Sequence, residues 1–102
     1  MKIEGLLPIG TVVRIERAPE QQLQIVGQAQ YHNETKRICD YSTVLFPQGY
    51  YDGDHLVLVN NEDIIQIDAY GYVDDESIEY TEHVENILQM LRDGRMTLDD
   101  LS

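Results

Sequence analysis

Residues 22–32 read QLQIVGQAQYH, and this stretch decides the fold class. Small or apolar side chains fall at every second position: Leu23, Ile25, Gly27, Ala29 and Tyr31. The positions between them hold Gln22, Gln24, Gln28, Gln30 and His32, interrupted only by Val26. A period of two is typical of a strand with one buried and one solvated face, which belongs to an antiparallel sheet. The glycine in mid-strand predicts a bulge or a bend that lets the sheet curl.

Four further stretches have strand character, and turn residues separate them: residues 11–17, 36–46, 55–59 and 64–72. We expect Ala18-Pro19-Glu20 to end the strand at 11–17, and residues 60–63 to form a turn or a single helical turn. About five consecutive antiparallel strands with a bend-permitting glycine predict a curved meander or a partial barrel. The pattern leaves open whether the sheet is open or closed.

The apolar period changes to that of a helix from about Asp75 to Arg92. Its apolar stripe consists of Tyr80, Val84, Ile87, Leu88 and Leu91. Acidic residues at 74–76 suit the positive end of the helix dipole, and Gly94 is a natural stop. We therefore predict an α+β fold, mostly β, with one C-terminal helix. We expect a single globular domain over residues 1–95 and a C-terminal tail over 96–102.

Charge is distributed unevenly along the chain. Residues 1–51 hold five acidic and five basic residues, whereas residues 52–102 hold fourteen acidic and two basic ones. The whole formal net charge of −12 therefore lies in the second half. Such a field repels nucleic acid and anionic membranes and speeds encounter with a basic partner. The alternative is that the charge only keeps the protein soluble.

The sequence contains no constellation of residues typical of an enzyme or a cofactor site. Its three histidines fall in three different predicted elements, and the single Cys39 lies in mid-strand without a neighbouring base. Asp52-Gly53-Asp54-His55 offers oxygen ligands for a cation but lacks the other ligands of an EF-hand, which favours a tight turn. We expect no catalytic residue, no cofactor and no metal.

No apolar stretch reaches the roughly 18–20 residues that a membrane-spanning helix needs. The first eight residues hold one lysine and only a short apolar run, Leu6-Leu7, which is too little for the apolar region of a signal peptide. A lone cysteine cannot form an internal disulfide. These features predict a cytoplasmic location.

Protein binding is the function class that remains. Asp75, Glu79 and Glu82 follow one another at helical spacing outside the apolar stripe, and Tyr70 and Tyr72 directly precede them. Tyrosine area next to charge is a common make-up of a protein interface. These five are the candidate protein-binding residues, with a merely solvated acidic face as the alternative.

Five short motifs occur in order: Leu7-Pro8-Ile9-Gly10-Thr11-Val12-Val13, Asp40-Tyr41, Phe46-Pro47-Gln48-Gly49, Asn61-Glu62-Asp63-Ile64 and Gly71-Tyr72. Over about residues 6–90 the chain thereby resembles domain-of-unknown-function family 4176, small proteins of Gram-positive bacteria. The resemblance implies a bacterial cytoplasmic protein whose relatives are commonly encoded beside type VII (ESX-like) secretion genes and their toxin effectors. It supplies no catalytic residues. It favours an accessory, adaptor or chaperone-like protein for such an effector, with an immunity protein or inhibitor of a basic toxin domain as the alternative.

Overall fold

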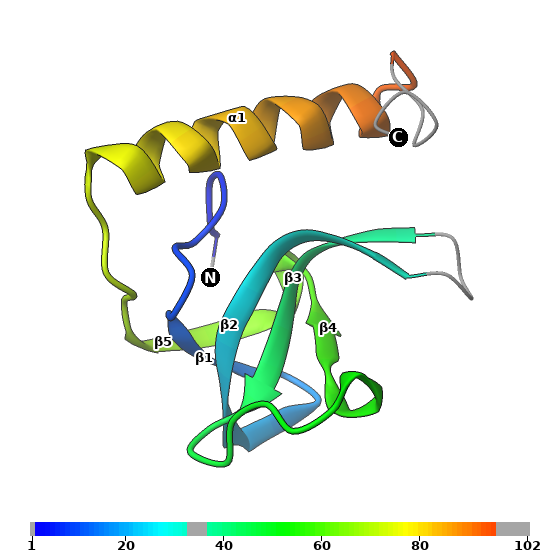
Figure 1. The fold of residues 1–102 in the computed structure, drawn as a ribbon. Helices are drawn as coiled ribbons and strands as arrows, with labels where there is room; N and C mark the ends of the chain where they lie inside the picture. The colour runs from blue at the N-terminus through cyan, green and yellow to red at the C-terminus, as the bar shows by residue number, and fades with distance from the viewer. Residues whose placement is uncertain (1, 33–36, 96–102) are drawn as a thin grey trace.

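A computed structural model describes residues 2–32 and 37–95 of the chain. One antiparallel sheet is followed by a single helix (Figure 1), and the predicted α+β class, mostly β, is confirmed. The strands are β1 (Val12–Ile15), β2 (Ala18–His32), β3 (Arg37–Leu45), β4 (Val57–Val59) and β5 (Ile64–Ala69). Two single 3-10 turns, η1 (Gly53–His55) and η2 (Asn61–Asp63), flank β4, and the helix α1 is Asp75–Arg92.

The strand order in the sheet is β4-β3-β2-β1-β5. The first four strands follow the meander that the sequence predicts, but β5 returns to the opposite edge and pairs with β1. Within the described residues β4 and β5 each pair with one strand, so the sheet is curved but open. The curl brings η2 next to the end of β1, where the Glu16 amide donates to the Asp63 carbonyl at 3.1 Å.

A bulge at Gly27 bends β2 and changes which face its side chains occupy. Ile25 pairs with Thr43 but Gly27 pairs with Ser42, so Val26 is the extra residue. Glycine fits here because a Cβ would lie 2.5 Å from the Ser42 hydroxyl oxygen. The predicted bulge is present.

The predicted faces hold for Leu23 and Ile25, which are buried, and are wrong beyond the bulge. Gln28, expected on the solvated face, lies opposite Tyr41 and is buried. Tyr31, expected in the core, is exposed. The cause is the single extra residue, because a shift of one position moves every later side chain to the other face.

Several predicted strand boundaries and faces also differ from the structure. β1 ends at Ile15 and not at residue 17, and β4 begins at Val57 and not at residue 55. β2 begins at Ala18, because Ile15 and Ala18 pair across a tight turn and Pro19 does not break the strand. β5 ends at Ala69 and not at residue 72. Alternation along residues 64–72 places Ile65 on one face with Ile67 and Ala69, but Ile65 is exposed because the β1–β5 register slips beside it.

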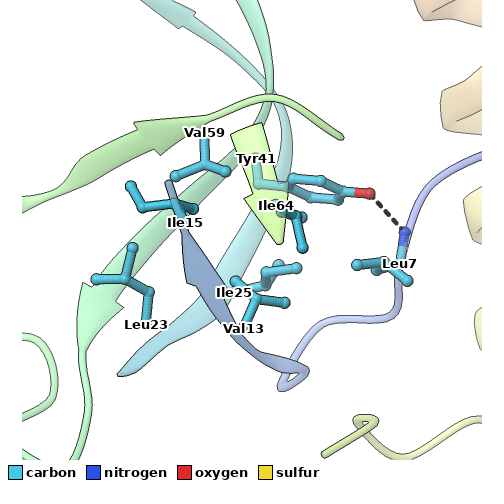
Figure 2. Packing of buried hydrophobic residues seen from close by; sticks show 8 residues of the cluster. All are labelled: Leu7, Val13, Ile15, Leu23, Ile25, Tyr41, Val59 and Ile64. Carbon is cyan, nitrogen blue, oxygen red and sulfur yellow. Dashed lines mark hydrogen bonds between the residues drawn. The ribbon is translucent and has the colours of Figure 1, made fainter. Parts of the chain in front are cut away.

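The hydrophobic core lies on the concave side of the sheet (Figure 2). It consists of Leu7, Val13, Ile15, Leu23, Ile25, Tyr41, Val59 and Ile64. Burying an aliphatic side chain of this size stabilises the fold by about 1.5–3 kcal/mol. All come from strands except Leu7, whose segment runs between the sheet and α1 (Figure 1).

Both ends of α1 are fixed by local hydrogen bonds, and its predicted bounds are confirmed. The Asp74 side chain accepts from the Ser77 amide at 2.8 Å, and the Ser77 hydroxyl accepts from the Asp74 amide at 2.8 Å. At the other end Gly94 has a positive φ of 77°, and the amides of Gly94 and Arg95 donate to Leu91 and Met90. The predicted tail over 96–102 lies outside the described residues, and so does the polar stretch at 33–35, where the sequence predicts the turn between two strands.

The connection from β5 to α1 passes directly over the segment that precedes β1. The Gly71 amide donates to the Thr11 hydroxyl at 3.0 Å, and a Cβ at Gly71 would lie 2.0 Å from the Ile9 carbonyl oxygen. That neighbour is backbone and cannot rotate away. Only glycine therefore permits this crossing.

We expect Gly71→Ala to destabilise the protein by about 1–3 kcal/mol or more, because two backbone segments must separate. Gly53→Ala is the matched control, since its Cβ would meet nothing within 4 Å. The measurement is the free energy of unfolding in urea. Equal stability of the two variants would contradict the close crossing.

A polar cluster joins three strands on the outer face of the sheet. The Asp68 carboxylate accepts from Gln22 at 2.7 Å, from Gln66, and from Arg14 at 2.8 Å. These hydrogen bonds, from Gln22 first and then Gln66 and Arg14, lower the pKa of Asp68 to about 2. The cluster ties β2, β1 and β5 together across the surface.

Because the folded pKa lies below the ordinary value of 3.8, Asp68 contributes stability that is present above about pH 4. That contribution is lost as the pH falls through about 2. An NMR titration of the Asp68 carboxyl should therefore give a midpoint near 2. In Gln22→Ala the midpoint should rise toward 3.8. An unchanged midpoint in that variant would mean that the Gln22 amide does not stabilise the carboxylate.

Candidate functional site

Helix α1 turns its acidic side away from the sheet. Val84 and Leu88 are buried, and Ile87 and Leu91 are half-buried, as the predicted stripe requires. Tyr80, predicted on the same stripe, is instead 61% exposed because it lies at the edge of the buried face. Asp75, Glu79 and Glu82 are all exposed, on the side of α1 opposite Val84 and Leu88.

The two candidate tyrosines flank the glycine that crosses over the N-terminal segment. Because the Gly71 backbone is held against Ile9 and Thr11, its neighbours lie at the surface. Tyr70 is 69% exposed and Tyr72 is 83% exposed. The close contact at Gly71 therefore determines where Tyr70 and Tyr72 lie on the surface.

A groove of about 250 Å³ lies between the first half of α1 and the N-terminal segment. Its walls are largely apolar and come from three parts of the chain: Leu6, Pro8 and Ile9, then Tyr72 and Val73, then Ile78 and Tyr80 of α1. Glu82 and Glu85 lie on its helical side, one and two turns after Ile78. In the described part of the chain no ion pair involves either carboxylate.

Gln28 contributes the polar part of the groove, from β2. Its side-chain amide nitrogen donates to the Leu7 carbonyl at 2.8 Å and lies 3.4 Å from the Thr81 hydroxyl. The residue is only 9% exposed, and its amide oxygen is buried without a hydrogen-bond partner among the described residues. The amide cannot turn over, because two oxygens would then face each other at Leu7. A buried unpaired acceptor of this kind costs about 1–3 kcal/mol.

The structure brings only two of the five candidate residues, Tyr72 and Glu82, into this groove. Tyr70, Asp75 and Glu79 lie on the surface without lining it. Sequence reasoning missed the groove residues Ile78, Glu85 and Gln28. Ile78 and Glu85 follow from helical spacing relative to Glu82, whereas Gln28 depends on the bulge at Gly27.

Asp40 and Tyr41 form a buried network beneath the helix. The Leu7 amide donates to the Tyr41 hydroxyl at 2.8 Å (Figure 2), and this hydroxyl donates to the Asn61 side chain. Burial raises the pKa of Tyr41 to about 12, so it stays neutral. Asp40 accepts from the Asn61 amide at 2.8 Å and pairs with Arg92 at 2.9 Å. Tyr41 belongs to the core.

A second, shallower cleft of about 760 Å³ gathers Arg17, Arg37 and Arg92. Arg17 donates to the Leu58 carbonyl at 3.0 Å, and Arg92 is paired with Asp40. Three carboxylates line the same cleft, those of Asp40, Glu62 and Asp63, and they balance the three cations. This arrangement holds α1 and β4 to the rest of the fold.

Cys39 also lines that cleft and is half-buried. Burial raises the pKa of its thiol, the opposite of the shift that a nucleophilic cysteine needs.

The ligand-rich loop at 52–55 forms a local turn. The Asp52 side chain caps η1 and its carboxylate contacts His55 Nδ1 at 2.5 Å, while the His55 ring lies 4.5 Å from that of Tyr51. The hydrogen bond from His55 lowers the pKa of Asp52. Among the described residues no group of three or more His, Cys, Asp and Glu side chains could hold a metal ion.

Fold and groove together define a small antiparallel-sheet protein with one covering helix and an exposed, tyrosine-rich surface. The chain belongs to the family described as "Domain of unknown function (DUF4176)", whose model matches residues 6–80. The match ends within α1, short of the resemblance over 6–90. Neither the curated proteins nor the solved structures include a match. No helix in the described residues is both long and apolar enough to cross a membrane.

The position of the candidate surface depends on how α1 is anchored. Leu88 is 5% exposed. We expect Leu88→Ala to lower the free energy of unfolding by about 2–5 kcal/mol through a cavity under α1. Met90→Ala, on the exposed side of the same helix, should change it by less than about 0.5 kcal/mol. Urea unfolding of both variants tests this, and a small loss at Leu88 would show that the helix contributes little.

Proposed function

We propose that this protein is a non-catalytic protein-binding module, an accessory, adaptor or chaperone-like protein for type VII secretion effectors. One observation carries the proposal: large apolar side chains are exposed together around the groove, beside the acidic side of α1. Tyr72, Tyr80 and Ile78 belong to this set. Clustered exposed apolar area of this kind marks interaction sites more often than isolated exposed residues do.

The electrostatics favour a basic partner. Two acidic residues of α1, Glu82 and Glu85, line the groove, and the second half of the chain carries the whole net charge of −12. Such a field accelerates encounter with a cationic surface. The family neighbourhood beside type VII secretion genes suggests where such a partner is encoded.

The same charge supports a second candidate, an immunity protein or inhibitor that neutralises a basic toxin domain. Co-expression with the neighbouring toxin separates the two functions. An inhibitor protects the cell from the toxin, whereas an adaptor changes only its export. The proposed cytoplasmic location suits both.

The experiment for the leading proposal is capture from the native host by the full chain, followed by identification of the bound proteins. Recovery of a secretion component or an effector supports the proposal. Capture of neither, from cells that express the secretion genes, would refute it.

With the identified partner, we expect Glu79→Lys with Glu82→Lys to slow association while the fold stays intact, most clearly at low salt. The physical reason is the loss of electrostatic steering. Glu16→Lys with Glu20→Lys is the matched control. Both residues are exposed, Glu16 in the turn between β1 and β2 and Glu20 in β2, and the variant gives the same change in net charge. Stopped-flow association rates at two salt concentrations measure the effect. Equal slowing in both double variants would assign the effect to net charge alone.

A further inference from the structure

We infer that the groove beside α1 binds the side chain of a lysine or arginine from a basic segment of the partner protein. This inference rests on the proposed function and names what that surface recognises. Three properties of the groove carry it: its apolar walls, its two carboxylates and its unpaired acceptor. Each matches one part of a long cationic side chain.

The apolar walls fit the stem. Lysine and arginine carry three or four methylene groups before the charge, and such stems bury well along apolar surface. The walls are formed by Leu6, Pro8, Ile9, Val73 and Ile78. Tyr72 and Tyr80 add aromatic faces to the same groove, and a cation over an aromatic ring gains about 0.5–1 kcal/mol at an exposed site.

The carboxylates fit the charged head. Glu82 and Glu85 line the groove from the same side of α1, and no ion pair within the described residues neutralises them. Carboxylates on the rim of an apolar groove repel an anion, and they leave a purely apolar side chain without the charge interaction that a cation gains. The groove therefore selects a group that is apolar along its length and positive at its end.

The unpaired acceptor fits the donors of that head. The buried amide oxygen of Gln28 lacks a hydrogen bond, and its orientation is fixed by the bond from the same amide to the Leu7 carbonyl. Thr81, which lies against this amide, is one helical turn before Glu85. An ammonium or guanidinium group has only donors, so it suits the carboxylates directly and the amide oxygen once the side chains that bury this oxygen move apart on binding.

The test uses the full chain and three small probes: the N-acetyl, N-methylamide derivatives of lysine, arginine and norleucine. Norleucine has an unbranched alkyl side chain without a charge. In NMR titrations at millimolar concentrations we expect the lysine and arginine probes to shift the Gln28 side-chain amide and the Ile78 methyl signals. The norleucine probe, which shares the stem but lacks the charge, should shift them much less. Equal shifts with norleucine would overturn the cationic assignment, and shifts confined to Asp75 and Glu79 would overturn the groove.

Two double variants of equal charge change locate the head group. Glu82→Gln with Glu85→Gln should weaken binding of the lysine probe by about two- to thirtyfold, the range for two ion pairs near the surface. Asp75→Asn with Glu79→Gln should leave its affinity within about twofold. Equal weakening in both would overturn the assignment to the groove.

The two proposals fail in different ways. Absence of any shift with the cationic probes overturns the lysine or arginine site, while a partner captured by the full chain would still support the proposed function. Specific shifts with the cationic probes support the site even if no secretion protein is captured, in which case the proposed function fails.

Discussion

The buried hydroxyl of Tyr41 is the interaction on which the rest of the structure depends. It accepts from the Leu7 amide, 34 residues away in sequence, and donates to Asn61, 20 residues away. The side-chain amide nitrogen of Asn61 in turn donates to the Gly5 carbonyl at 2.7 Å. A hydroxyl can both donate and accept, so one side chain on β3 satisfies the N-terminal segment and η2 together. No aliphatic residue could hold these two segments in register.

The groove exists because of this constraint. Tyr41 holds the N-terminal segment against the core, and its neighbour Asp40 pairs with Arg92 near the end of α1. Two consecutive residues of β3 thereby fix both walls, the segment on one side and the helix on the other. Gly71 adds the third part, because its close approach to Ile9 determines where Tyr72 leaves the sheet. Two walls of the groove are irregular segments, and the hydrogen bonds, the ion pair and the close backbone contact that stabilise the fold also hold these segments in place.

The sequence predicted the features that depend on local periodicity, and failed where a single residue changes the geometry. The bounds of α1 follow from its apolar spacing and its caps, which lie within a few residues of each other. The pairing of β5 with β1 is a contact between distant segments, which alternation in β5 does not encode. The burial of Gln28 depends on where the extra residue of the bulge lies, because one position reverses all later side chains. Tyr72 and Glu82 were identified individually, but their joint position in one groove required the path through Gly71.

The charged residues fall into two groups: those whose ion pairs hold the elements together, and those that form no ion pair within the described residues. The ion pairs that join separate elements, Arg14–Asp68 and Arg92–Asp40, link the two halves of the chain and hold strands and helix together. In the described residues the α1 carboxylates from Asp75 to Glu85 form no ion pair. Like charges at helical spacing repel by a few tenths of a kcal/mol per pair. This repulsion and the unpaired oxygen of Gln28 both raise the free energy of the unbound protein. Under the proposed function, a bound cation removes both costs. The same residues that weaken the isolated fold would therefore strengthen the complex.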